Sequence, residues 1–408
     1  MLRKSKLLYL FLMVQLAGLT VARAQTAQSG AVDLTKQPAL FVVGYAHLDT
    51  QWRWDYTKTI GDYIPNTMHD NFALFEKYPH YIFNFSGANR YRMMKEYYPA
   101  DFAKVKQYVA AGRWFPSGSS MEESDVNVPS AESIIRQILY GSEFFRREFG
   151  KTSAEYMLPD CFGFPASLPS ILSHAGIKGF STQKLTWRSA NGIPFNVGIW
   201  EGLDGKSVIA ALNPGTYDGD VTEDLSKSEP WVKRIQVQGK QSGLFTDYHY
   251  YGTGDVGGSP REAAVKLMEE IVTKGRAALP SSAGRKVQVG DGPLKVVSAT
   301  AEQMFLDIKP NETSRLPRYK GDLLLIEHSA GSISSQTYMK RWNRHNEVLA
   351  DAAERASIAA QWLGGRPYPL ERLNHAWTLV MGGQFHDILP GTSLRRRMSI
   401  PGTTKCWR

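Results

Sequence analysis

The amino-acid sequence predicts an α/β protein with a mostly parallel β-sheet. A continuous apolar run at residues 40–45 (LFVVGY) is typical of a strand that is buried on both faces. Short strand-like segments alternate with helical patterns further along the chain, and this alternation favours a parallel sheet covered by helices. With 408 residues, 42% of them hydrophobic and 21% charged, the composition is globular and excludes a disordered, collagenous or coiled-coil chain.

The expected elements follow that first strand in order. The patterns of apolar residues predict helices at residues 101–111, 132–149, 168–175 and 261–279, and strands at 207–211 and 295–297. A stretch containing Pro and Lys at 310–321 marks the expected end of this first domain. Beyond it, two helical patterns at 336–363 and 370–381 with a short connection predict a small helical bundle.

The formal net charge of +9 is confined to the two ends of the chain. Residues 1–24 carry four basic residues and no acid, and residues 392–408 carry five basic residues and no acid, so the body between them is neutral. A neutral body lacks the phosphate-tracking surface that dominates nucleic-acid affinity. The sequence therefore predicts no nucleic-acid partner, and it contains no indication of the oligomeric state.

Residues 1–24 have the pattern of a secretory signal peptide. Three basic residues precede an apolar run at 7–21, and the sequence ARA at 22–24 supplies the small residues of a cleavage site. We therefore expect a periplasmic or secreted protein with no membrane association after signal removal; a retained membrane anchor is the alternative. Only Cys161 and Cys406 follow, too few for a disulfide framework.

Polar residues follow the predicted first strand, in the segment AHLDTQW at 46–52. Side chains two residues apart on an extended backbone point the same way, so His47 and Asp49 should converge at the carboxyl end of the strand. Ligand crevices open at that end in α/β sheets. An imidazole and a carboxylate are half of a zinc-type ligand set. A hydrogen-bonded His–Asp pair that only caps a loop is the alternative.

Three further segments carry candidate functional side chains. LPDCFGFP at 158–165 presents Asp160 between a proline and an aromatic–glycine turn, and GGQFHDILPGTS at 382–393 presents His386 and Asp387 after a predicted helix. The Gly-rich segment at 251–260 presents Asp255, but it lacks the lysine and spacing of a phosphate-binding loop. For Asp160 the alternative is a turn-forming role, and for His386 it is a structural role.

Together, the four segments resemble glycoside hydrolase family 38, the α-mannosidases. The resemblance extends from about Leu40 to Ser393 and includes the connecting sequences GRW at 112–114, EESDVN at 122–127, RQILYG at 136–141 and QKLTW at 183–187. It implies a seven-stranded β/α barrel-like or sheet catalytic domain at 38–315 and an incomplete helical middle domain at 322–393.

The resemblance also implies roles for individual residues. His47, Asp49, Asp160 and His386 match the family's ligands to one zinc ion, and Asp160 also matches the catalytic nucleophile. Asp255 is the candidate acid/base, and Trp52 and Asp387 are candidates for binding the sugar. Trp54 and Trp187 could also stack on sugar faces, and ordinary core packing is the alternative for them.

The chemistry of these residue types agrees with that assignment. Two imidazoles and two carboxylates suit zinc better than calcium. Retaining hydrolysis of an α-mannosidic bond in a mannose-containing glycan needs one carboxylate to attack and one carboxylic acid to protonate the leaving oxygen, and the acid needs a raised pKa. Cys161 lies beside Asp160, but the sequence offers it no partner histidine, and buried packing is the expectation for it.

The resemblance ends at Ser393, and the last residues, 394–408, form an acid-free basic tail. We interpret this tail as a frameshift or a wrong gene end, with a natural tail as the alternative. Two further hypotheses stay open: a truncated family 38 fragment without turnover, and a zinc-dependent hydrolase similar to polysaccharide deacetylases. The second of these would not need Asp160 as a nucleophile.

Overall fold

The computed structural model describes residues 32–279 and 285–393. The expected signal peptide at 1–24 and the basic tail at 394–408 therefore lie outside the described residues. The chain divides into two compact units at residues 1–33 and 34–408, and every element below belongs to the second unit. Among the helices that are described, none is long and apolar enough to cross a membrane.

The first sheet is built around β1 (Ala39–Ala46), whose eight residues are all buried. Strand β8 (Thr246–Thr253) pairs with β1 in parallel along its whole length. The opposite edge of β1 is shared by β11 (Lys295–Ser298) at its start and β2 (Phe83–Ser86) near its end, and β3 (Trp114–Ser117) extends the sheet from β2. All four ladders are parallel, which confirms the predicted buried strand and the predicted class of sheet.

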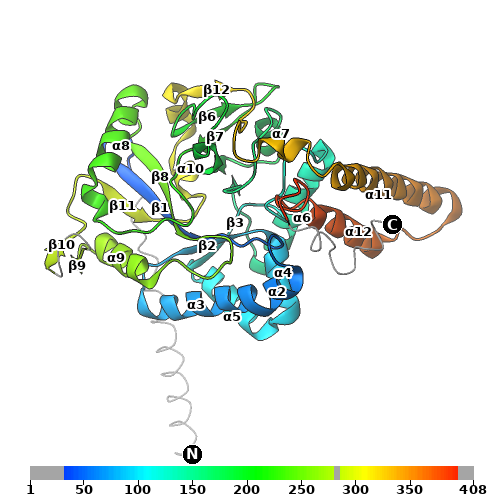
Figure 1. Ribbon diagram of the computed structural model, residues 1–408, viewed down its shortest axis with the longest axis horizontal. Coiled ribbons are helices and arrows are strands. Elements are labelled where there is room, and N and C mark those ends of the chain that lie inside the picture. Colours follow the sequence, from blue (N-terminus) through cyan, green and yellow to red (C-terminus); the bar gives the residue numbers. More distant parts are fainter. Residues whose placement is uncertain (1–31, 280–284, 394–408) are drawn as a thin grey trace, which may run out of the picture. The chain divides into compact units, whose positions relative to one another are not determined.

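The second sheet has the order β12-β6-β7-β5-β4. Its strands are β4 (Glu155–Met157), β5 (Gly179–Ser181), β6 (Val197–Glu201), β7 (Ser207–Ala211) and β12 (Arg318–Lys320). Only the β6–β7 ladder is antiparallel. The two sheets contact each other where β3 lies beside β4 and β6 lies beside β8 (Figure 1). The predicted mostly parallel α/β domain is thus formed by two five-stranded sheets.

Helices cover these sheets and confirm the α/β architecture. The helices before the second sheet are α2 (Tyr56–Lys58), α3 (Ile64–Lys77), α4 (Ala88–Tyr97), α5 (Pro99–Ala110) and α6 (Ala131–Phe149), with a π-helical turn at Thr59–Tyr63. The later ones are α7 (Leu168–His174), α8 (Glu229–Ser242), α9 (Glu262–Val272) and α10 (Gln303–Asp307). Helix α8 packs on β8 and α9 on β11, whereas α5 packs on β3 (Figure 1).

The helix predicted at 261–279 is too long and ends at Val272. Lys274 adopts a left-handed φ of 55°, and the Gly275 N–H donates to the Glu270 carbonyl, so the chain turns back there. The remainder of the predicted helix forms β9 (Arg276–Ala278), which pairs with β10 (Lys286–Gln288) in a separate two-stranded sheet.

A long helical hairpin follows the sheets. Helix α11 (Thr337–Gly364) packs on α12 (Leu370–Gly383), and α12 also contacts α6 of the sheet region (Figure 1). The predicted helices at 336–363 and 370–381 are therefore confirmed to within two residues at each end. Residues 384–393, which carry His386, leave α12 and run against the first sheet region, where the Asp125 N–H donates to the Gln384 carbonyl at 2.9 Å.

Candidate active site

The segment after β1 is joined to the segment after β8. The His47 N–H donates to the Thr253 carbonyl, and the Asp49 N–H donates to the Asp255 carbonyl, both at 2.8 Å. The first bond follows directly on the parallel ladder of β1 and β8, and the second belongs to an antiparallel bridge between Leu48 and Val256, beyond the carboxyl ends of the two strands. As a result, two of the segments singled out by sequence lie side by side although more than half the described chain separates them.

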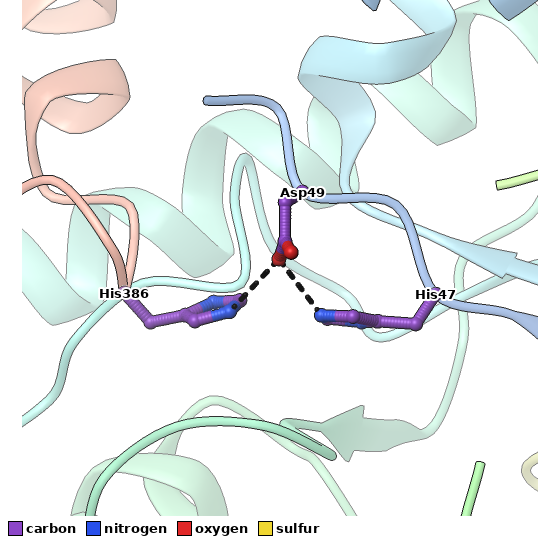
Figure 2. Close-up of side chains that lie close together, drawn as sticks. All are labelled: His47, Asp49 and His386. Carbon is purple, nitrogen blue, oxygen red and sulfur yellow. Dashed lines mark hydrogen bonds and ion pairs between the residues drawn. The ribbon is translucent and has the colours of Figure 1, made fainter. Parts of the chain in front are cut away.

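His47, Asp49 and His386 form a buried cluster (Figure 2). The Asp49 Oδ1 lies 3.0 Å from the His47 Nε2 and 3.4 Å from the His386 Nε2. The three ligand atoms lie within 4.8 Å of one another, as the ligands of one metal ion would. The His386 Nε2 is buried and has no hydrogen-bond partner, so the residues present fit a cation that this nitrogen would bind.

Neighbouring charges shift the pKa values of His47 and Asp49 in this cluster. Burial lowers the pKa of His47, but the carboxylates of Glu123 and Asp49 outweigh burial and raise it to about 10. Burial raises the pKa of Asp49, and the His47 charge overcomes this and holds it below its usual range. Without a cation the His47 ring therefore carries its second proton, and a metal ion that bound there would displace it.

Asp160 follows β4 and faces two different groups. Its Oδ2 lies 3.7 Å from the His386 Nε2, on the side of the cluster, and its Oδ1 lies 2.5 Å from the Lys184 Nζ. The Tyr217 hydroxyl oxygen also lies 3.3 Å from this Oδ1. One carboxylate oxygen is thus available to the metal position while the other is held by a buried ammonium group and a hydroxyl.

Asp255 stands in the Gly-rich loop after β8, with a left-handed φ of 67°. Its Oδ1 accepts a hydrogen bond from the same Tyr217 hydroxyl, at 3.0 Å. Burial raises the pKa of Asp255, as do the nearby Asp49 and Asp160, whereas the bond from Tyr217 lowers it. The glycine backbone of this segment approaches the first strand closely: a Cβ on Gly252 would lie 1.7 Å from the Tyr45 carbonyl oxygen.

The hairpin contributes His386 and Asp387 to this site. The Asp387 Oδ2 lies 3.8 Å from the His386 Nε2, and the other Asp387 carboxylate oxygen accepts from the Thr392 hydroxyl. Burial and the charge of Asp49 raise the pKa of Asp387 well above its ordinary value. The Ser393 hydroxyl donates to the Gln51 carbonyl at 2.9 Å, so the end of this segment is tied to the loop after β1.

The three tryptophans have different surroundings. The Trp54 indole N–H donates to the Asp49 carbonyl at 3.0 Å and the side chain is buried, so it supports the ligand loop. Trp52 is half-buried, with its ring edge-on to Trp54 and the Arg53 guanidinium 4.0 Å above it. Trp187 is partly exposed and lies 4.0 Å from the Lys184 ammonium.

Sequence reasoning missed three residues of this site. Glu123 and Tyr217 contact His47, and Lys184 contacts Asp160. Glu123 and Lys184 lie in sequences that carry the family resemblance, at 122–127 and 183–187, which was the only signal for them. Tyr217 had none. Cys161 is buried with its thiol directed at the Ser124 carbonyl, 3.3 Å away, and burial raises its pKa to about 12, which keeps the thiol protonated.

Most of the chain matches two domains that belong to the same group of enzymes. Residues 37–321 match the N-terminal domain of glycosyl hydrolases family 38, and residues 328–398 match the α-mannosidase middle domain. Alpha-mannosidase G of Dictyostelium discoideum is 34% identical over 88% of this chain and 31% of its own length. Human alpha-mannosidase 2C1 is 29% identical over 88% of this chain and 32% of its own length. The chain thus spans about a third of the length of these curated relatives.

The fold is also similar to that of a solved structure. An alpha-mannosidase from Enterococcus faecalis V583 superposes with a TM-score of 0.70 at 19% identity, covering 91% of this chain and 41% of that one. This likeness confirms the α/β fold followed by a helical segment.

Proposed function

This chain belongs to glycosyl hydrolases family 38, and on that premise we propose that it is an exported, zinc-dependent, retaining α-mannosidase acting on terminal α-mannosidic bonds of glycans. The observation that carries the proposal is the pair Asp160 and Asp255, which face one Tyr217 hydroxyl beside the His47–Asp49–His386 cluster. The names of the relatives support mannose as the sugar.

The spacing of the two carboxylates supports the retaining mechanism. Retaining pairs lie about 5–5.5 Å apart and inverting pairs about 6.5–9.5 Å, to admit a water molecule. Because the Asp160 Oδ1 and the Asp255 Oδ1 lie 3.3 and 3.0 Å from one hydroxyl, their separation cannot exceed the sum of these distances. These are the facing oxygens of the two carboxylates, and a separation within that limit favours a retaining pair over the wider inverting arrangement.

In the first step an Asp160 carboxylate oxygen bonds to the anomeric carbon, while the bond from that carbon to the leaving oxygen breaks and the leaving oxygen takes the proton of Asp255. In the second step Asp255 removes a proton from water, the water oxygen bonds to the anomeric carbon, and the bond to Asp160 breaks. The raised pKa of Asp255 suits a group that must hold its proton before the first step.

His47, Asp49, Asp160 and His386 would hold the zinc ion. A zinc ion there would act as a Lewis acid toward sugar hydroxyls and favour a flattened ring. The protein supplies the orientation: Trp54 supports the Asp49 loop, and Lys184 holds the oxygen of Asp160 that faces away from His386. We also propose that the buried Asp387 binds a sugar hydroxyl and that Trp52 forms the floor of the sugar site.

Export to the periplasm or the exterior is proposed from the pattern of residues 1–24 alone. It is tested by the N-terminal sequence of the secreted or periplasmic protein, which should begin at Gln25. A mature protein that keeps residues 1–24 would contradict the proposed cleavage.

The activity is tested with a purified aryl α-mannoside and the purified protein. We expect release of the aryl alcohol, loss of turnover with a chelator and recovery on adding zinc, with α-mannose as the first product. Turnover that is unaffected by chelation would overturn the metal assignment, and β-mannose as first product would overturn the retaining assignment. Zinc binding without any turnover would support a fragment that only binds metal or sugar.

A further inference from the structure

Glu123 contacts both histidines of the cluster, through different parts of the same residue. It is fully buried in the segment between β3 and α6. Its carboxylate Oε2 lies 3.2 Å from the His47 Nδ1. Its main-chain carbonyl lies 2.8 Å from the His386 Nδ1 and also accepts from the His386 N–H at 3.2 Å.

These contacts determine which nitrogen of each ring faces the cluster. A carbonyl oxygen only accepts hydrogen bonds, so the His386 Nδ1 carries the proton and its Nε2 keeps a free lone pair. A carboxylate likewise stabilises a proton on the His47 Nδ1. The two Nε2 atoms then point at the same Asp49 Oδ1, from 3.0 and 3.4 Å (Figure 2).

The Glu123 carboxylate is itself held rigidly. Its Oε1 accepts from the Tyr45 hydroxyl at 2.5 Å, from the Arg90 Nη1 at 3.0 Å and from the Ser86 hydroxyl. Arg90 is fully buried and its Nε donates to the Leu48 carbonyl at 3.0 Å, between the two ligands of the β1 loop. With its Oε1 occupied by these donors, the carboxylate presents Oε2 to His47.

We propose that Glu123 is a positioning residue that orients both histidine ligands and thereby makes one divalent-cation site from two distant parts of the chain. The proposal rests on the proposed metal site and adds to it the residue that orients its two histidines. A buried ion pair gives little net stability by itself, which favours a role in specifying geometry. The His47 ligand comes from the sheet and the His386 ligand from the segment after the hairpin; Glu123 faces the first with its carboxylate and is hydrogen-bonded to the second through its main-chain carbonyl.

The test is the affinity for zinc of the full chain carrying Glu123→Gln, measured by competition with a chromophoric chelator. We expect affinity to fall by roughly 10- to 100-fold, the usual effect of losing a partner of a histidine ligand. Glu122→Gln is the matched control, since Glu122 is equally buried and its Oε1 is bonded to the Asn89 Nδ2 at 2.6 Å. The control should keep the affinity of the unaltered protein.

A spectroscopic readout separates positioning from a general loss of structure. The visible absorption of bound Co²⁺ reports ligand geometry, and we expect Glu123→Gln to change this spectrum while Glu122→Gln does not. If Glu123→Gln fails to fold, Ser86→Ala removes one of the donors to the Glu123 Oε1, keeps the charge of Glu123 and leaves the contacts of both histidines in place. It should weaken zinc binding by a smaller factor, roughly three- to tenfold.

The outcomes distinguish this inference from the metal site it rests on. Unaltered protein should bind zinc in a manner that His386→Ala abolishes; if it does not, both the metal site and the role of Glu123 are refuted. If the unaltered protein binds zinc in this way and Glu123→Gln binds it equally with the same Co²⁺ spectrum, the positioning role alone is refuted.

Discussion

The sheet region and the helical hairpin meet at the candidate site, but they are stabilised in different ways. All eight residues of β1 are buried, whereas the 28-residue helix α11 buries only four, and two of those, Asn343 and Glu347, are polar. At the far end of α11, Trp362 is 87% exposed and Leu363 84% exposed. The ligands from the sheet thus stand on a dense core, and Phe385, Ile388 and Leu389 set His386 in that same core, whereas α11 adds little buried apolar surface.

Directional polar contacts attach α11 to the sheet region. The Glu347 Oε1 accepts from the Ser133 hydroxyl at 2.6 Å and the Ser130 N–H at 2.8 Å, both at the start of α6. Arg136 of α6 forms a bidentate pair with Glu354, at 2.6 and 2.9 Å. Hydrogen bonds depend on direction as well as distance, so these contacts fix the position of α11 although it buries few apolar residues.

The largest effect is expected on the sheet side, from Asp160→Asn. The amide cannot attack the anomeric carbon, so turnover should fall by at least roughly 10⁴-fold, while its oxygen keeps zinc bound. Steady-state kinetics and zinc content check both statements. Asp224→Asn, a buried carboxylate that caps a short 3₁₀ turn, is the control and should keep full turnover. A deacetylase-type hydrolase would retain activity with Asp160→Asn.

Next in size is the cost of removing the apolar anchor of the hairpin. Trp377 of α12 is fully buried, with the Arg136 guanidinium 4.0 Å from its ring. Trp377→Ala should lower the free energy of unfolding by about 3–5 kcal/mol. Trp362→Ser, in the same hairpin but exposed, should change it by less than about 0.5 kcal/mol. Chemical denaturation measures the free energy of unfolding of both variants. An equal loss of stability in the two would contradict the statement that Trp377 anchors the hairpin and Trp362 does not.

The polar attachment is tested by Glu347→Ala. Leaving the half-buried Ser130 N–H and the buried Ser133 hydroxyl without their acceptor should cost roughly 1–3 kcal/mol. Because Glu347 also accepts from Gln384, two residues before His386, zinc affinity should fall as well. Hydrogen exchange should speed up in α11 and α12 and stay slow in β1. Faster exchange throughout the sheet would mean that the two regions unfold as one.

The smallest effect is a shift in pH dependence. Since Asp255 must be protonated to donate, kcat/KM should fall as the pH rises through its raised pKa. The Tyr217 hydrogen bond lowers that pKa, so Tyr217→Phe should raise it further and move the alkaline limb to higher pH. The pH profile of kcat/KM with an aryl α-mannoside checks this. A limb that moves to lower pH would rule out Asp255 as the acid.

Local sequence was sufficient for part of this description. The buried strand at β1, the helices α6, α11 and α12, and the convergence of His47 with Asp49 all follow from side-chain periodicity over a few neighbouring residues. By contrast, β4 and β5 have three residues each, too few to display a period, and the helix predicted at 261–279 was ended by a turn at Lys274. The starts of α3 and α8 did carry a signal, a proline in the first turn, that the sequence analysis did not use.

By itself, then, the sequence determined the α/β class, the hairpin and the four segments that carry the polar side chains. Only the tertiary structure decided that Tyr217 lies between Asp160 and Asp255, that Lys184 pairs with Asp160, and that Glu123 holds both histidines. The physical reason is that these contacts are made between loops, where no periodicity constrains a side chain's direction. They exist because parallel ladders and the polar bonds of the hairpin bring those loops to the same ends of the strands.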